Sequence, residues 1–357
     1  MTARVIHLAS GREWRGGQRQ VWLLARELAR LGGVHQVVIT GAGGELHDRL
    51  RSDGIPVRTV PWSAGLDPRV LPGLLTELRS PDSLVHAHDA HAVTLGGVAA
   101  RLARRPLIAT RRVDFHLRRR GFWGRAERVI AISRAVADVL VADGIDPGRI
   151  VIVHSGIALE DIRRSDRLGV RARLGLTPDA LVAANVAALV EHKDHPTLLR
   201  AAAHLAGRHP QLHWVVAGEG PERTALEELR RTLGLEDRVH LLGYLPDPAR
   251  LVRDADLFVM SSREEGLGTS VLDAMALGIP VASTEAGGLP EMLGHGAGAL
   301  APPGDPVALA AAVARVLEDP DFARSIVSRA TTAVERFTAR RMAEGVRSVY
   351  RSCDSLP

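Results

Sequence analysis

Cysteine and long apolar runs are almost absent from this chain. Cys353 is the single cysteine in 357 residues, which excludes an intramolecular disulfide and a cysteine-based zinc or iron–sulfur centre. No stretch approaches the roughly 18 uninterrupted apolar residues that a membrane-spanning helix needs. The first fifteen residues carry three arginines without the apolar core of a signal peptide after them. We therefore expect a reducing, cytoplasmic location.

Lysine and asparagine are equally scarce, since each occurs once, at Lys193 and Asn185. The chain has 46 basic residues, of which all but Lys193 are arginines. Such usage is typical of a GC-rich genome, in which arginine replaces lysine wherever a surface charge suffices. A lysine that persists predicts a position where a compact ammonium is required rather than a planar guanidinium. Lys193 is therefore a candidate functional residue.

Aromatic residues make up only 3% of the chain, whereas its basic character is pronounced. The net charge of +5 and the isoelectric point near 10.3 favour an anionic partner. A nucleic-acid-binding protein would stack bases on aromatic side chains or present a basic recognition helix, and neither is indicated here. We therefore expect no nucleic acid, and favour a phosphate-bearing molecule or an anionic membrane surface.

Short apolar runs alternate with helix-like stretches along the whole chain. Strands that alternate with helices predict an α/β fold of two doubly wound, Rossmann-like domains. Their ligands are expected in an interdomain cleft, at the carboxyl ends of the strands. The alanine run at 308–314 and the apolar spacing at 340–353 predict further helices. The predicted strands are 5–9, 36–40, 57–60, 84–87, 107–110 and 129–132, then, after an arginine-rich stretch at 159–173, 181–187, 214–217, 239–242, 257–260 and 280–283.

The most informative segment joins the strand that ends at Met260 to a following helix. Its loop is rich in glycine, and Thr269 or Ser270 is expected to cap the helix. Small residues at a helix start let backbone amides approach an anion, and the helix dipole adds to the attraction. Glu265 and Asp273, separated by seven residues, are poor phosphate ligands but good acceptors for sugar hydroxyls. The simpler alternative is that these two acids bind no ligand and are present because the helix dipole favours negative charge near a helix start.

This segment resembles the signature of the retaining nucleotide-sugar glycosyltransferases of family four, which have the two-domain GT-B fold. Glu265, seven residues and Asp273 match the family's Glu-x7-Glu, with a shorter second acid. The Ala-Met-Ala at 274–276 and the Gly-Ile-Pro-Val at 278–281 also match, and the resemblance extends over almost the whole chain. It implies an enzyme that moves a hexose, with retention and without a metal or cofactor, from a UDP-, GDP- or ADP-sugar to a hydroxyl of a glycan or glycolipid. The expected setting is bacterial cell-surface polysaccharide or lipopolysaccharide assembly.

The resemblance also implies a role for each domain. Residues 1–160, with a C-terminal helix at 340–357 packed back on them, would bind the acceptor, and residues 165–339 the donor. Lys193 takes the lysine place of the family's phosphate-binding Arg-x4-Lys element, whereas Ala188 stands at the arginine. Arg15 and Arg263 are candidate substitutes for that arginine.

Candidate site residues follow from the same resemblance. Lys193 would stabilise the leaving diphosphate and Glu265 would hold the donor sugar, which makes them the candidate catalytic residues. The candidate donor-binding residues are Gly16, Gly17, Gly218, Gly243, Tyr244, Glu265, Gly266, Leu267, Gly268, Thr269 and Asp273. The candidate acceptor-side residues are Arg15, His88, Arg111 and Arg112.

Two features remain open to a second interpretation. His86, His88 and His91 lie at or just after a predicted strand and could bind a metal, although no acid stands where metallohydrolase motifs have one, so we expect none. Residues 101–128 hold ten arginines and several apolar side chains, which suits either peripheral contact with an anionic membrane or a solvated basic surface. For the whole protein, a catalytically weak sugar-nucleotide-binding or scaffold partner and a nucleotide-sugar epimerase are the alternative functions.

Overall fold

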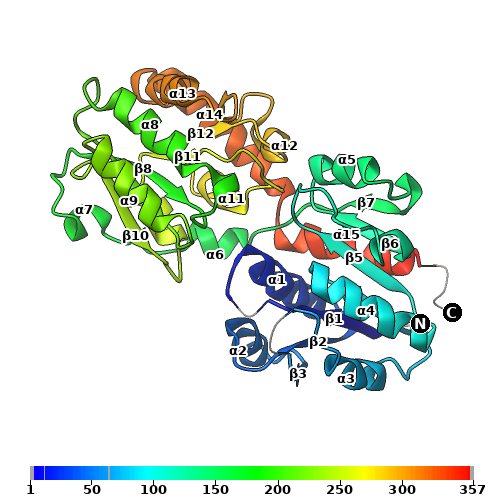
Figure 1. The fold of residues 1–357 in the computed structure, drawn as a ribbon. Helices are drawn as coiled ribbons and strands as arrows, with labels where there is room; N and C mark the ends of the chain where they lie inside the picture. The colour runs from blue at the N-terminus through cyan, green and yellow to red at the C-terminus, as the bar shows by residue number, and fades with distance from the viewer. Residues whose placement is uncertain (1–3, 12, 63–64, 354–357) are drawn as a thin grey trace. The chain divides into compact units, whose positions relative to one another are not determined.

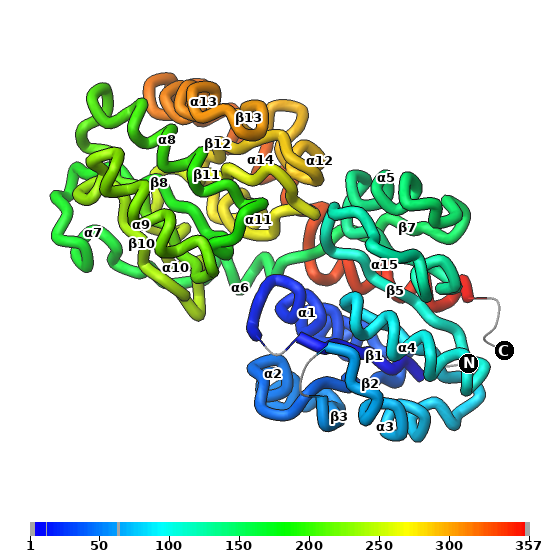
Figure 2. Tube along the Cα trace, viewed as in Figure 1, coloured from blue at the N-terminus to red at the C-terminus, as the bar shows by residue number. Residues whose placement is uncertain are grey.

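The computed structural model describes residues 4–11, 13–62 and 65–353. The chain divides into two compact units, which we call unit 1 (Met1–Gly156 with Phe337–Pro357) and unit 2 (Ile157–Arg336). Each unit is a parallel sheet packed between helices (Figures 1 and 2). The predicted α/β class with two Rossmann-like domains is therefore confirmed.

Unit 1 is built on a seven-stranded sheet of order β3-β2-β1-β4-β5-β6-β7 in which all pairs are parallel. Its central strands are buried almost throughout because helices cover both faces of the sheet. The strands are β1 (Arg4–Leu8), β2 (His35–Gly41), β3 (Val57–Val60), β4 (Ser83–Ala87), β5 (Leu107–Arg111), β6 (Arg128–Ala131) and β7 (Ile150–Ile152). The helices are α1 (Gly16–Leu31), α2 (Glu45–Ser52), α3 (Val70–Glu77), α4 (Ala90–Ala103), α5 (Arg134–Ala142) and α15 (Ala339–Arg351), with short 3-10 turns at η1 (Trp123–Arg125) and η2 (Pro147–Arg149).

Helix α15 belongs to unit 1 and packs against α1. Its buried side chains, which include Met342, Val346 and Tyr350, recur at helical spacing. Residues 354–357 of the predicted C-terminal segment lie outside the described residues. The chain leaves unit 1 after Gly156 and re-enters it at Phe337, and these two points are adjacent, since a Cβ on Gly156 would lie 2.4 Å from the Thr338 carbonyl oxygen.

Gln20 of α1 binds the first of these points. Its side-chain amide donates to the Gly156 carbonyl oxygen over 2.8 Å, and its oxygen accepts from the Gly156 N–H over 3.1 Å. Both polar groups of a buried side chain are thereby satisfied. Gly156, the last residue of the first segment of unit 1, is thus hydrogen-bonded to the second turn of α1.

Unit 2 has a six-stranded parallel sheet of order β10-β9-β8-β11-β12-β13. Its core includes Trp214, Phe258 and the leucines of α8. The strands are β8 (Leu181–Val186), β9 (Leu212–Ala217), β10 (Val239–Gly243), β11 (Leu257–Met260), β12 (Val281–Thr284) and β13 (Ala299–Ala301). The helices are α6 (Leu159–Arg163), α7 (Val170–Arg173), α8 (His195–Leu205), α9 (Arg223–Thr232), α10 (Ala249–Val252), α11 (Thr269–Ala276), α12 (Leu289–Leu293), α13 (Pro306–Glu318) and α14 (Pro320–Ala333), with 3-10 turns at η3 (Glu191–Lys193) and η4 (Val334–Arg336).

All eleven predicted strands are present, but β7 and β13 were not predicted. Both have only three residues, and the Ala-Leu-Ala of β13 carries no strand preference of its own. The arginine-rich stretch at 159–173 belongs to unit 2, where it forms α6 and α7. It is held there because Asp254 accepts from the Val170 N–H over 2.9 Å and the carboxylate of Asp256 binds Arg171.

Candidate functional site

Each sheet has one point at which the strand order reverses, and the candidate residues gather there. In unit 2 the reversal lies between β8 and β11, and in unit 1 it lies between β1 and β4. Loops that follow two such strands diverge and leave space for a ligand at the carboxyl edge of the sheet. Lys193 follows β8 and Glu265 follows β11, so both belong to the reversal point of unit 2.

The structure brings Lys193 and Glu265 together as an ion pair. The Lys193 ammonium lies 2.5 Å from a Glu265 carboxylate oxygen, and the two side chains are only 16% and 9% exposed. The Ser262 hydroxyl is 3.3 Å from the same oxygen. A cation and an anion that neutralise each other in a shielded position can exchange partners when an anionic ligand with hydroxyl groups arrives. The chain's single lysine thus stands at a site suited to such a ligand.

The two loops that carry this pair are joined by further hydrogen bonds. The Arg263 N–H donates to the His192 carbonyl oxygen over 2.9 Å, and the Ser261 hydroxyl donates to the Lys193 carbonyl oxygen over the same distance. Asp194, with a positive φ of 46°, caps α8 through the Thr197 N–H and binds the Arg263 guanidinium over 2.8 Å. Arg263, a candidate substitute for the arginine missing at Ala188, is therefore engaged by Asp194.

Glycines allow the loops after β9 and β10 to pack closely beside the loop between β8 and α8. That loop carries Lys193, and we call it the Lys193 loop. A Cβ on Gly218 would lie 1.8 Å from the Ala187 carbonyl oxygen, and one on Gly220 would lie 2.2 Å from that of Leu189. The Gly218 N–H donates to the Gly243 carbonyl oxygen over 2.8 Å, and Gly243 itself has a φ of +79°. Any side chain at Gly218 would push the loops apart. Gly218 and Gly243 are therefore placed together beside the Lys193 loop.

The start of α11 lies in the same loop as Glu265. Gly268, with a φ of +90°, is the N-cap residue and has no side chain with which to cap the helix. The prediction that Thr269 or Ser270 caps α11 is therefore wrong, because the helix already begins at Thr269. Backbone N–H groups of a first helical turn have no acceptor one turn earlier in the helix and are suited to binding an anion. Gly266, Leu267 and Asp273 of the same segment are buried, whereas Tyr244 is 50% exposed.

His195 and Asn185 lie behind the Lys193 loop and were not predicted as site residues. The His195 ring lies 3.2 Å from the Asn185 amide oxygen, and the Asn185 amide donates to the Val259 carbonyl oxygen over 2.8 Å. Burial, with a contribution from the Lys193 charge, lowers the pKa of His195 to about 4. The signal in the sequence was that Asn185 is the single asparagine of the chain.

In unit 1 the carboxylate of Asp89, which follows β4, joins the two loops at the reversal point. It accepts from the Ser10 N–H over 2.7 Å and from the Ser10 hydroxyl over 2.6 Å, and it caps α4 through the Ala92 N–H. Gly16 and Gly17 begin α1 in the neighbouring loop. Arg15 lies on the surface of that loop, where it pairs with Glu13. Asp89 and Ser10 were not predicted as site residues.

Three histidines meet beneath this edge of unit 1. Atoms of His7, His86 and His88 that could bind a metal lie within 4.8 Å of one another, and all three residues are buried. His7 joins the cluster through β1, next to His86 in the sheet register, whereas His91 is exposed on α4. Burial lowers the pKa of His7 to about 4 and the pKa values of the other two well below 6.5. The rings are therefore neutral at pH 7.

Arg111 and Arg112 differ in their environment although they are neighbours. Arg112 lies 3.4 Å from the His88 ring, and its Cδ is 3.9 Å from the position of a Cβ on Gly17. Burial lowers the pKa of Arg112 to about 10, so the side chain stays charged at neutral pH. Arg111 instead binds the Phe115 carbonyl oxygen and lies over the Trp123 ring. The structure therefore joins His88, Arg112 and Gly17, and places Arg111 elsewhere.

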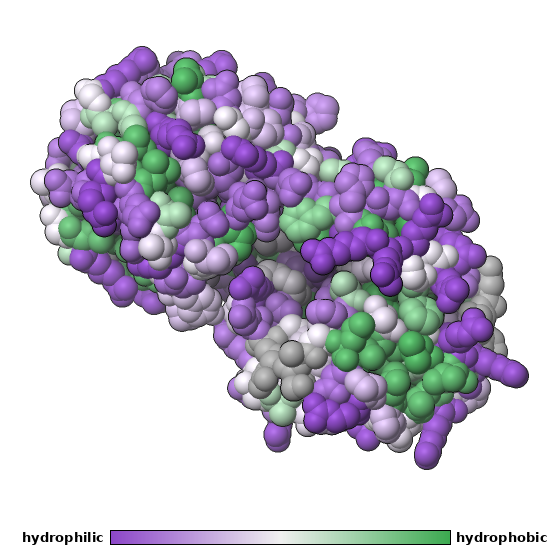
Figure 3. All heavy atoms as spheres, in the orientation of Figure 1, coloured by the Kyte–Doolittle hydropathy of each residue, from purple (hydrophilic) through white to green (hydrophobic). Residues whose placement is uncertain are grey.

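The arginine-rich segment of unit 1 presents charge but little aromatic surface. Arg118, Arg119 and Arg120 are exposed, whereas Trp123 is buried and Phe122 packs closely against Gly97. Figure 3 shows hydrophilic residues interspersed with a hydrophobic area on the visible face of unit 1. The arginines are thus available on this surface, whereas the Trp123 side chain is not.

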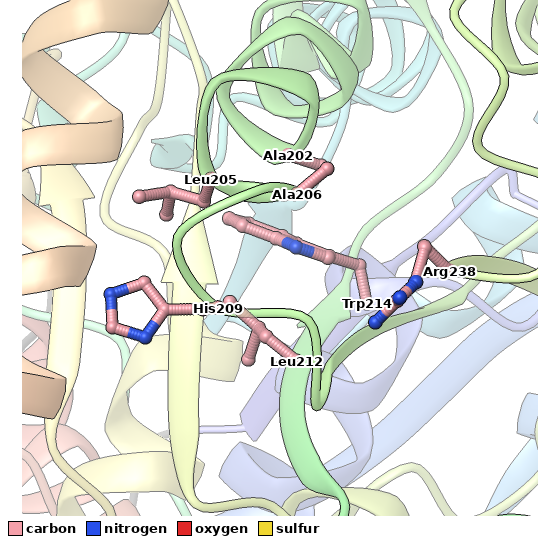
Figure 4. Close-up of a pocket in the computed structure, with 7 residues that line it drawn as sticks. All are labelled: Ala202, Leu205, Ala206, His209, Leu212, Trp214 and Arg238. Atoms are coloured by element: carbon pink, nitrogen blue, oxygen red, sulfur yellow. The ribbon is translucent and has the colours of Figure 1, made fainter.

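Figure 4 shows a small, open hollow on unit 2. It is lined by the end of α8, including Ala202 and Leu205, and by Leu212 and Trp214 at the beginning of β9. The amino ends of the strands form this edge, which is opposite to the edge that carries Lys193 and Glu265. The hollow therefore has no part in the candidate site.

Comparisons with known proteins identify the family. Residues 167–333 match the family described as Glycosyl transferases group 1, and residues 14–161 match Glycosyltransferase Family 4. A relative from Catenulispora acidiphila, named D-inositol 3-phosphate glycosyltransferase 1, is 30% identical over 342 residues, which are 84% of this chain and 81% of that protein. The chain belongs to the group 1 glycosyltransferases. The predicted family is therefore confirmed.

Other relatives of this group 1 glycosyltransferase match over a shorter length. A D-inositol 3-phosphate glycosyltransferase from Streptomyces bingchenggensis is 35% identical over 246 residues, which are 64% of this chain and 53% of that protein. This chain spans about half the length of several relatives with that name. Among solved structures, Anabaena HepE in complex with UDP-glucose has a TM-score of 0.87 at 24% identity, over 98% of this chain and 99% of that one. The predicted GT-B fold is thereby confirmed.

Among residues 4–11, 13–62 and 65–353 of this group 1 glycosyltransferase, no helix is both long and apolar enough to cross a membrane.

Proposed function

We propose that this protein transfers a hexose from a nucleoside diphosphate sugar to a hydroxyl of its acceptor, with retention at the anomeric carbon. The observation that carries the proposal is the shielded Lys193–Glu265 pair at the reversal point of unit 2. Family membership supplies the reaction class, and this pair supplies a cation for the diphosphate and an acid for the sugar. We assign the donor to unit 2 and the acceptor to unit 1.

In the proposed mechanism the departing diphosphate gains negative charge as the bond to the anomeric carbon breaks. The Lys193 ammonium and backbone N–H groups at the start of α11 stabilise that charge, and stabilisation that grows in the transition state lowers the barrier. Glu265, released from Lys193, accepts hydrogen bonds from hydroxyls of the donor sugar. Asp273 on α11 is assigned to the ribose. Since these groups neutralise the leaving group, the proposal includes no metal.

A UDP-sugar is the donor that we propose first. Structural neighbours with this fold include Anabaena HepE in complex with UDP and with UDP-glucose. The same arrangement of Lys193, Gly218 and Gly243 would accept a GDP- or ADP-sugar, because the backbone groups of such loops contact phosphates rather than a particular base.

A phosphorylated acceptor is the acceptor class that we propose. Relatives at 30–36% identity are named D-inositol 3-phosphate glycosyltransferases, and the acceptor edge of unit 1 carries the charged Arg112 beside Gly17. A guanidinium next to a helix start is suited to a phosphate group. A neutral glycan or a glycolipid of a cell-surface pathway is the competing acceptor class.

The donor experiment measures thermal stabilisation by UDP-, GDP-, ADP-, TDP- and CDP-sugars, each with and without EDTA. We expect one nucleotide sugar to stabilise the wild type in EDTA and to stabilise Lys193→Met much less at the same concentration. Arg200→Met, which removes an exposed cation from α8, is the matched control and should respond like the wild type. A response that requires a divalent metal would refute the metal-independent mechanism.

Transfer itself is tested with the donor so identified and with inositol phosphate or a neutral sugar as acceptor. We expect a product whose anomeric proton coupling matches that of the donor, which is the signature of retention. Donor binding without transfer or hydrolysis would favour a scaffold protein, and a changed sugar nucleotide without acceptor would favour an epimerase. Flotation with anionic vesicles tests peripheral contact through Arg118, Arg119 and Arg120.

A further inference from the structure

A chain of hydrogen bonds runs through the buried centre of unit 1 from Arg112 to His7. The Arg112 guanidinium lies 3.4 Å from Nδ1 of His88, and Nε2 of His88 lies 2.9 Å from Nδ1 of His7. Nε2 of His7 is buried and has no hydrogen-bond partner among the described residues. The parallel pairing of β1 with β4 positions the two histidines next to one another.

The direction of both hydrogen bonds follows from the Arg112 end. A guanidinium has only donors, so Nδ1 of His88 accepts and Nε2 of His88 carries the proton. That proton is donated to Nδ1 of His7, so the neutral His7 ring carries its own proton on Nε2. One tautomer of each ring is therefore selected.

A second pair of bonds accounts for the remaining histidine. Nδ1 of His86 lies 2.7 Å from the Tyr350 hydroxyl of α15, and Nε2 of His86 lies 2.7 Å from the Thr110 hydroxyl. A metal bound by the three histidines would have to break one of these bonds and the bond between His7 and His88. It would also bring a second cation close to Arg112, which is unfavourable in a buried site. The contacts thus favour a proton-ordered chain over a metal site.

We propose that His88 and His7 are positioning residues that orient the Arg112 guanidinium for the acceptor. The inference rests on the proposed function and assigns the acceptor contact to Arg112 rather than to His88. Both nitrogens of the His88 ring are occupied by Arg112 and His7, so His88 acts through Arg112. Loss of the acceptor on His7 releases the tautomer of His88, and with it the orientation of Arg112.

The first experiment determines the tautomers by long-range proton–nitrogen correlation spectra of the full chain labelled with nitrogen-15 in histidine. At pH 7 we expect protonated Nε2 and unprotonated Nδ1 in both His7 and His88. In Arg112→Met, His88 should lose this single-tautomer signature, whereas the exposed His91→Asn control should leave it unchanged. A protonated Nδ1 in His88, or rings that shift on addition of stoichiometric zinc, would overturn the proposal. Neither result depends on transfer activity.

The second experiment separates a positioning role from a structural one. His7→Phe removes the acceptor of the His88 proton at a buried position, and His7→Asn keeps an oxygen acceptor close to the place of Nδ1. In His7→Phe we expect the acceptor KM to rise about five- to ten-fold, as for the loss of one hydrogen bond, with donor KM and nucleotide stabilisation unchanged. His7→Asn should recover most of the loss. Equal acceptor KM values in all three proteins would overturn the positioning role, whereas an inactive wild type would refute the proposed function and leave the spectra to decide the chain.

Discussion

Replacing Lys193 by methionine leaves the Glu265 carboxylate, whose side chain is 9% exposed, without its ammonium partner. A charge-assisted hydrogen bond of this kind contributes about 1.5–3 kcal/mol. Since about 1 kcal/mol corresponds to roughly 2–4 °C for a domain of about 150–250 residues, the melting temperature of unit 2 should fall by about 3–12 °C. The same contact, transferred to a diphosphate, predicts a donor affinity that is lower by roughly 10- to 150-fold.

A double-mutant cycle measures this interaction without assuming the cost of either substitution. The four proteins are the wild type, Lys193→Met, Glu265→Gln and the double variant, each unfolded by heat and by urea. We expect the double variant to be more stable than the sum of the two single changes predicts, because Glu265→Gln removes the charge that Lys193→Met leaves buried. Isothermal titration with the nucleotide sugar should show that Lys193→Met loses affinity.

Additive effects within about 0.5 kcal/mol would show that the pair contributes nothing to folding. Unchanged donor affinity in Lys193→Met would refute the assignment of the diphosphate to this lysine. Arg200→Met, on the exposed side of α8, separates a local effect from a general loss of positive charge. If that variant also loses donor affinity, the reasoning from a single ammonium is wrong.

Three further predictions concern the same loops and the core of unit 1. Gly218→Ala should destabilise unit 2 by about 3 kcal/mol or more and abolish donor binding, since its Cβ would lie 1.8 Å from a carbonyl oxygen; urea unfolding and titration check this. Burial lowers the pKa of His195 to about 4 in the folded protein, so between about pH 6.5 and 4 the unfolded state binds a proton that the folded state does not. The free energy of unfolding should therefore fall by roughly 2–3 kcal/mol as the pH is lowered across that range, and His195→Asn should flatten this pH dependence in urea unfolding. Truncation before Arg340 removes Tyr350 and the apolar face of α15, so unit 1 should melt earlier and expose its core to a hydrophobic dye, and an unchanged melting curve would contradict this packing.

The architecture was predictable because it depends on alternation over many residues. Apolar runs separated by helical stretches determine the α/β class whatever the details of one side chain. The two strands that escaped prediction, β7 and β13, have three residues each and pair only at sheet edges, where neighbouring strands rather than local preference decide.

The site was predictable where chemistry leaves a mark in a short segment. Lys193 was recognisable as the single lysine, and Glu265 by its distance from Asp273. The ion pair between Lys193 and Glu265 was not, because it joins residues 72 positions apart and depends on how two loops cross.

His7 shows the same limit in unit 1. Within an apolar strand it is indistinguishable from a residue of the core, and only the register of β1 beside β4 brings it to His86. Arg111 and Arg112 were equivalent in the sequence, and only the fold directs one to His88 and the other to Trp123.

The adjacency of Gly156 and Thr338 has a consequence for synthesis on the ribosome. Unit 2 is inserted into unit 1, so all of its residues leave the exit tunnel before α15 does. Unit 2 can therefore be complete before unit 1, because the first 156 residues of unit 1 must wait for the helix that carries Tyr350 to His86. During that interval these residues expose the apolar surface that α15 covers, and it is then that chaperones are expected to bind the nascent chain.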